Sequence, residues 1–114
     1  MDSLLPSDSE HFEYVAVGEV HDLPSGGRLF VEINDETIVV FNIRGKYFAI
    51  ADLCSHDNGP LGDGELEGFE VICPRHGARF DVRDGKARSL PAVVDILAYP
   101  VRVVNGQIEI GLPT

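Results

Sequence analysis

The sequence has little positive charge and few cysteines. Lys and Arg number 9 against 19 Asp and Glu, which gives a formal net charge of −10. This balance disfavours duplex nucleic acid and anionic lipid as partners, because both are bound through Lys and Arg. A basic protein is a better candidate partner. The two cysteines, Cys54 and Cys73, could form at most one disulfide, so the chain is not a disulfide-rich secreted scaffold.

Long apolar runs are also missing. The first residues, Met1–Pro6, have neither the basic nor the apolar region of a secretory signal. The longest aliphatic or aromatic run, Tyr47–Ala51, is far below the ~20 residues of a membrane-spanning helix. We therefore expect a cytoplasmic protein with no membrane association. With 114 residues, 44% of them apolar, the chain should form one domain over residues 11–114, after a polar tail of residues 1–10.

Turn signals recur at short intervals and leave room for short strands but not for long helices. The segments between them are rich in β-branched and aromatic residues, which favour strands. The expected strands are Phe12–Val17, Arg28–Ile33, Thr37–Ile43, Tyr47–Ala51, Phe69–Ile72 and Ile96–Val104. The pattern predicts an all-β fold, a small antiparallel sandwich or barrel. Only Gly18–Asp22 is compatible with a helical turn.

Two segments give the sharpest local predictions. Both alternating faces of Thr37–Ile43 are largely apolar, so this strand is expected to be buried. Near the C-terminus, apolar and polar residues alternate on both sides of Asn105-Gly106. This dipeptide favours a type I′ hairpin turn, which needs positive φ at both central residues.

Two short motifs, Cys54-Ser55-His56 and Cys73-Pro74-Arg75-His76, each combine a thiolate donor with an imidazole donor, and sixteen residues separate them. Each motif closely follows an expected strand, so both should lie on loops at strand ends, where a rigid scaffold can hold a metal centre from two sides. Nearby glycines would let backbone N–H groups approach an anionic centre. They are Gly59, Gly62, Gly64 and Gly77.

Three interpretations of these motifs are open. A buried cysteine taken singly is most often an apolar core residue, but two matched pairs of donors are harder to explain by chance. A structural Cys2His2 zinc site usually places like ligands together, whereas here each loop is mixed and Cys54-x-His56 is unusually tight. Mixed loops suit a [2Fe–2S] cluster in which two cysteines bind one iron and two histidines bind the other.

The pattern Cys-x-His, sixteen residues, Cys-x2-His resembles the Rieske ferredoxins that serve multicomponent aromatic-ring dioxygenases, and the similarity extends from about Phe12 to Leu112. It implies a Rieske-type fold with a two-loop cluster-binding subdomain at about residues 53–81. The resemblance implies one Rieske [2Fe–2S] cluster per chain. Its ligands would be Cys54 and Cys73 on one iron and His56 and His76 on the other.

The same resemblance implies an electron carrier with no catalytic residues. It would act as a monomer and pass one electron at a time from a flavoprotein reductase to a terminal oxygenase. One alternative is a small subunit of an enzyme complex, similar to that of assimilatory nitrite reductase, and another is the structural zinc module. The remaining histidines, His11 and His21, are expected at the surface, and they are too few for the His-His-carboxylate iron site of an oxygenase.

Two departures from the wider Rieske pattern concern the loops. Respiratory and photosynthetic Rieske proteins carry a disulfide between positions that hold Gly59 and Arg75 here, and they carry Ser and Tyr hydroxyls where this chain has Ala78 and Phe80. Missing hydroxyl donors and nearby acidic residues both disfavour the reduced cluster, so we expect a reduction potential of about −150 mV. The acidic residues are Asp57, Asp63, Glu65, Glu67 and Glu70. We expect Arg75, Arg79 and Arg83 to be solvated or to contact a partner.

Overall fold

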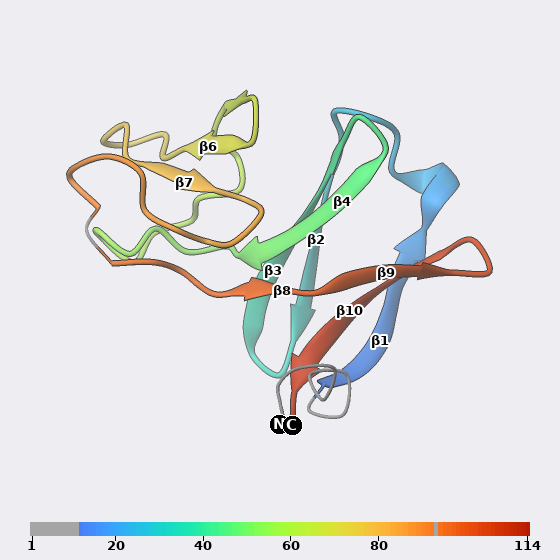
Figure 1. The fold of residues 1–114 in the computed structure, drawn as a ribbon. Coiled ribbons are helices and arrows are strands. Elements are labelled where there is room, and N and C mark those ends of the chain that lie inside the picture. The colour runs from blue at the N-terminus through green and yellow to red at the C-terminus, as the bar shows by residue number, and fades with distance from the viewer. Residues whose placement is uncertain (1–11, 93) are drawn as a thin grey trace, which may run out of the picture.

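The computed structural model describes residues 12–92 and 94–114, and in this part of the chain it consists of three antiparallel sheets and one short 3-10 helix (Figure 1). The expected polar tail, residues 1–10, and His11 lie outside the described residues. The first sheet contains β1 (Phe12–Glu19), β10 (Gln107–Pro113) and β9 (Val101–Val104), in that order. The second contains β2 (Arg28–Ile33), β3 (Glu36–Ile43), β4 (Lys46–Ala51) and β8 (Ala98–Tyr99). The third contains β5 (Leu66–Glu67), β6 (Glu70–Ile72) and β7 (Arg79–Asp81).

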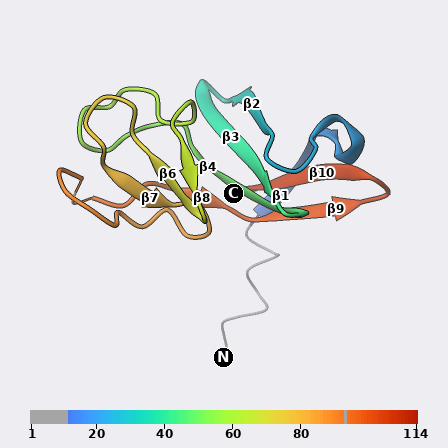
Figure 2. The ribbon, with the colours of Figure 1, turned by 90° about the horizontal axis from the view of Figure 1, so that it is seen from above.

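These sheets form two regions. The scaffold, residues 12–51 and 98–114, contains the first two sheets. The loop subdomain, residues 52–92 and 94–97, contains the third sheet and both motif loops, and it lies to one side of β4 in both ribbon views (Figures 1 and 2). The expected all-β architecture with a two-loop subdomain is confirmed.

Strand β3 connects the two regions through its two faces. Ile38 and Val40 point into the scaffold core, where they pack with Ile108 and Ile110 of β10. Val39 and Phe41, on the opposite face, belong to a second core that continues into the loop subdomain. All these β3 side chains are at most 1% exposed, so the prediction of a strand buried on both faces is confirmed.

The predicted hairpin at the C-terminus is also confirmed. Asn105 and Gly106 have φ values of 52° and 78°, and they connect β9 to β10, whose residues pair in antiparallel register. These positive values are the ones that a type I′ turn requires. The expected helical turn within Gly18–Asp22 is present as the 3-10 helix η2 (Val20–Asp22). No helix among the described residues is long and apolar enough to cross a membrane.

The single strand expected over Ile96–Val104 is wrong. The chain changes sheets at Pro100: β8 before it pairs with β4, and β9 after it pairs with β10. Proline has no N–H to donate to a sheet, so it suits such a break. The carbonyl of Pro100 still accepts a hydrogen bond from Gly111 N–H at 2.9 Å, which anchors the crossing.

Candidate metal centre

The two motif loops have a similar construction. In the first, which follows β4, Cys54 N–H donates to Gly59 O at 2.8 Å, and Asn58 N–H donates to Cys54 O at 2.7 Å. In the second, which follows β6, Cys73 N–H donates to Ala78 O at 2.7 Å. Each loop is thus closed by backbone hydrogen bonds at its cysteine. The prediction that both motifs lie on loops after strands is confirmed.

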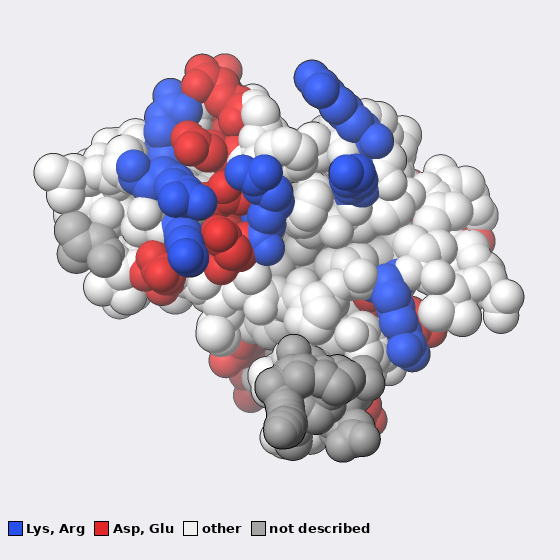
Figure 3. Space-filling model, viewed as in Figure 1, with Lys and Arg blue, Asp and Glu red and all other residues white. Residues whose placement is uncertain are grey.

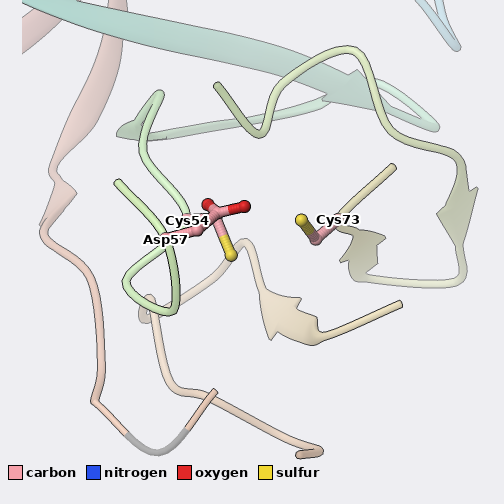
Figure 4. A group of neighbouring side chains, drawn as sticks. All are labelled: Cys54, Asp57 and Cys73. Atoms are coloured by element: carbon pink, nitrogen blue, oxygen red, sulfur yellow. The ribbon is translucent and has the colours of Figure 1, made fainter. Parts of the chain in front are cut away.

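The structure brings the four predicted site residues together as two pairs, one of cysteines and one of histidines. Cys54 and Cys73 are 0% and 2% exposed and belong to the core that β3 shares with the loop subdomain. Their sulfur atoms lie within 4.8 Å of each other and face one another across the gap between the loops (Figure 4). Two thiolates on one tetrahedral metal, with bonds of about 2.3 Å, would be about 3.8 Å apart. The rings of His56 and His76 are exposed, perpendicular to each other, with centroids 4.9 Å apart.

The backbone of each loop favours a charged sulfur. Burial raises the pKa of the Cys54 thiol, although two N–H groups of its own loop oppose this effect. At Cys73, burial also raises the pKa, but the backbone N–H groups of Arg75 and His76, the Cys54 thiol and the charge of Arg75 together outweigh it, and the pKa of this thiol is lowered. Donors aimed at a thiolate stabilise the form that binds metal. The same donors would stabilise the negative charge of a metal–sulfur centre.

The sequence did not predict the position of Asp57. One of its carboxylate oxygens lies within 4.8 Å of both cysteine sulfurs (Figure 4). Both oxygens are bound by Arg75, with Nε at 2.6 Å from Oδ2 and Nη2 at 2.9 Å from Oδ1. The guanidinium holds the pKa of this carboxyl well below its usual range. The carboxylate is therefore occupied by Arg75, and its Oδ2 also lies 3.6 Å from Nδ1 of His76. The imidazole nitrogens do not belong to this group of three donors.

The role expected of the glycines is partly wrong. All four of their N–H groups bond to protein acceptors: those of Gly59 and Gly62 to carboxylates, and those of Gly64 and Gly77 to backbone carbonyls. The N–H groups that reach the sulfurs belong to other residues of the loops. At Gly64 the missing side chain serves close packing instead, since a Cβ there would lie 1.8 Å from Ile72 O.

The three arginines in and after the second loop each pair with an acidic side chain and remain partly exposed. Arg75 binds Asp57, Arg79 binds Glu67 at 2.7 Å and Glu70 at 3.4 Å, and Arg83 binds Asp81. Figure 3 shows these alternating charges over the loop subdomain. The arginines offset part of the acidic charge on which the expectation of a low potential rested. His21, with a side chain 72% exposed, is at the surface as expected.

The donor set fits an iron–sulfur cluster. Two buried thiols are backed by four N–H donors, and two adjacent imidazoles of the same loops are exposed. This order of soft sulfur inside and nitrogen outside matches a cluster with one thiolate-bound iron and one imidazole-bound iron.

Comparison with known proteins identifies a domain family and, within it, similar proteins of one kind. Residues 13–100 match the family described as the Rieske [2Fe-2S] domain. A ferredoxin component of naphthalene 1,2-dioxygenase/salicylate 5-hydroxylase systems from Ralstonia sp. is 39% identical over 91 residues, covering 80% of this chain and 88% of the relative. The 3-phenylpropionate/cinnamic acid dioxygenase ferredoxin subunit of Escherichia coli (strain K12) is 41% identical, with 82% and 89% covered.

Solved structures agree with this placement. The ferredoxin of carbazole 1,9a-dioxygenase from Nocardioides aromaticivorans IC177 has a TM-score of 0.82 and 31% identity, with 89% of this chain and 98% of that chain covered. A ferredoxin bound to the oxygenase of carbazole 1,9a-dioxygenase gives 0.79 and 26%, with 85% and 91% covered. The chain belongs to the Rieske [2Fe–2S] ferredoxins that are components of aromatic ring-hydroxylating dioxygenase systems. It is an electron carrier, and this favours the cluster over the zinc alternative.

Proposed function

We propose that Cys54 and Cys73 bind one iron of the cluster and that His56 and His76 bind the other. The observation that carries this assignment is the pairing of like donors across the two loops. The two sulfurs lie within 4.8 Å of each other in the core, and the two imidazole rings of the same loops lie 4.9 Å apart at the surface. Imidazole ligands leave the oxidised core less negative than four thiolates would, which makes it easier to reduce. When bound, the cluster accepts and releases one electron at a time.

The exposed histidines give this carrier its contact surface for partners. Leu90 and Val94, with exposures of 76% and 60%, lie in the segment that runs beside both loops. Ser89 Oγ in this segment accepts a hydrogen bond from Arg79 N–H near the second loop, and Ser55 Oγ in the first loop donates to Val94 O. Exposed apolar side chains around a redox centre favour close, dry contact with another protein.

We propose that a flavoprotein reductase and a terminal oxygenase use this surface in turn. A ferredoxin bound to its oxygenase in the carbazole system supports the second partner. A single exposed edge of the centre implies that the two partners compete for it, so the carrier must dissociate between accepting and delivering an electron. The separate ferredoxin relatives favour such a shuttle over the alternative of a permanent subunit, as in nitrite reductase.

Chemical analysis and directed substitution test the ligand assignment. We expect about two irons and two acid-labile sulfides per chain and an EPR signal of low average g after reduction. Cys54→Ser should abolish cluster binding, and His76→Cys should lower the reduction potential toward the value of about −400 mV found with four thiolates. His21→Ala is the matched control and should leave iron content and potential unchanged. A colourless protein that contains zinc and no sulfide would refute the assignment.

The docking surface is tested separately with reductase and oxygenase of one system. Leu90→Ser should slow electron transfer with both partners while the visible absorbance of the cluster stays the same. Val103→Ser removes an equally apolar, 47% exposed side chain from β9 and serves as the control. Equal rates for Leu90→Ser and the control would contradict a docking surface at this position.

A further inference from the structure

The strongest side-chain connection between the two motif loops is an ion pair. Arg75 of the second loop donates to both carboxylate oxygens of Asp57 in the first, at 2.6 Å and 2.9 Å. Their side chains are only 34% and 23% exposed, so water screens this pair less than a fully exposed one. Bidentate contacts of this kind are among the strongest polar interactions and fix the relative orientation of both groups.

Further contacts fasten both partners to the first loop. Arg75 Nη1 donates to Pro60 O at 2.7 Å, so three guanidinium nitrogens bind that loop. Asp57 Oδ1 also accepts the N–H of Gly59 at 2.9 Å. A Cβ at Gly59 would lie 2.7 Å from the guanidinium carbon, so the absence of a side chain makes room for this arginine. Lysine, with one nitrogen, cannot reproduce this arrangement.

We propose that Asp57 and Arg75 form an electrostatic clasp that holds the two ligand loops closed, and that both act as positioning residues for the four ligands. The inference rests on the proposed ligand assignment. Each partner lies within its own motif loop, one residue after His56 and one residue before His76. The separation of the two residues therefore directly limits the separation of the two ligand pairs, and opening the clasp moves one pair away from the other.

Arg75 has a second consequence for metal selectivity. It occupies both oxygens of a carboxylate that otherwise lies within 4.8 Å of both cysteine sulfurs. Without Arg75, this free carboxylate would stand beside two thiols as a third donor, and zinc accepts such a mixed set. Substitution of Asp57 also removes the clasp, but it removes the carboxylate as well, so no third donor is left beside the thiols. The two single variants therefore both release the loops but differ in the metal that they admit.

The test measures cluster loss in the presence of a chelator, followed by visible absorbance, in the intact holoprotein. Asp57→Asn and Arg75→Gln should each lose the cluster about tenfold faster. The double variant should be far less than a hundredfold faster, because the ion pair is the main interaction that both single variants lose. Arg75→Lys should restore only part of the retention. Arg79→Gln is the control: it removes one positive charge and two ion pairs in the loop subdomain but joins no ligand loops, so retention should stay within about twofold of the native rate.

Two additional measurements separate the clasp from general damage. High salt should speed cluster loss slightly in the native protein but not in the double variant, because only the native protein has a clasp to screen and its partial burial limits the screening. When expressed with excess zinc, Arg75→Gln should contain more zinc than Asp57→Asn. Native retention in both single variants, or equal loss in Arg79→Gln, would overturn the proposal. Cluster binding by the Cys54→Ser variant would instead refute the ligand assignment itself.

Discussion

The scaffold and the loop subdomain are stabilised in different ways. Scaffold strands run for up to 8 residues and enclose a continuous apolar core. Strands of the loop subdomain have only 2 or 3 residues, and its chain is held by side-chain hydrogen bonds and ion pairs in addition to its share of the second core. Asp52, for example, accepts the N–H groups of Leu61 and Gly62 at 2.8 Å and 2.6 Å. Apolar burial tolerates small displacements, whereas such directional contacts fix a loop in one geometry.

This difference in stabilising contacts matches the different structural roles of the two regions. The scaffold forms an apolar core of its own and supports the loop subdomain, which places four donor atoms that two irons must reach at once. Arg28 of β2 spans the boundary, because it donates to the carbonyls of Gly62 and Gly64 in the loop subdomain. The shared core around Phe41 is the second connection. The following substitutions test how far the two regions depend on each other, from the largest expected effect to the smallest.

Phe41→Ala should have the largest effect and should weaken both regions. The ring is fully buried on the face of β3 that packs in the same core as Cys54 and Cys73. Removal of such a side chain costs about 3–5 kcal/mol. We expect the free energy of unfolding to fall by this amount and cluster absorbance and strand circular dichroism to disappear in one transition. Phe30→Ala, at a ring 41% exposed, is the control with a smaller loss. Separate transitions would show that the shared core does not couple the regions.

Gly64→Ala should damage the loop subdomain alone. The new Cβ would lie 1.8 Å from Ile72 O, directly before the ligand loop of Cys73, so the backbone must move. Such overpacking costs about 1–3 kcal/mol, and we expect the upper end because the clash is with backbone. Hydrogen exchange should rise at amides of the loop subdomain and remain slow in β3. Gly68→Asn is the control, because nothing lies within 4 Å of that glycine and Asn tolerates its φ of 61°. Faster exchange in β3 would contradict the separation of the regions.

The same difference explains what the sequence could and could not predict. The predictions of a buried strand over Thr37–Ile43 and of a hairpin turn at Asn105-Gly106 were correct, because the alternation of side chains and the residue preferences of turns are local patterns. Strands β5 and β7 were missed because 2 or 3 residues are too few to show a period. The break at Pro100 was missed because the apolar residues on its two sides look continuous, although they join different sheets.

For the candidate site, the donor types and their distribution over two loops favoured one kind of cluster, and the resemblance to Rieske ferredoxins implied the four ligands, which remain a prediction. The roles of Asp57 and Arg75 depend on how the loops meet in space. Eighteen positions separate the two residues, and no local pattern connects them. Their opposite charges were visible in the sequence, but many other acidic and basic residues offered the same pairing.

The smallest expected effect concerns pH and Asp81 at the end of β7. Its side chain is 3% exposed, and hydrogen bonds from Arg83, at 2.8 Å to 3.0 Å, hold the pKa of its carboxyl below the usual value of 3.8. A lowered pKa in the folded state means that the carboxylate stabilises the fold above about pH 4 and that this stabilisation is lost as the pH falls through the folded pKa.

Asp81→Asn should therefore reduce the free energy of unfolding by about 1.5–3 kcal/mol at pH 7, the range for hydrogen bonds to a charged group. The difference between native protein and variant should shrink as the pH falls toward 3, when the native carboxylate is itself protonated. Comparing the two proteins at each pH removes the acid sensitivity that they share through the cluster. Asp63→Asn, at an exposed position of the same subdomain, is the control and should change little at any pH. A constant difference between native protein and Asp81→Asn would show that the Asp81 charge does not stabilise the loop subdomain, whose stability would then depend on the apolar packing of Phe80 and Val82.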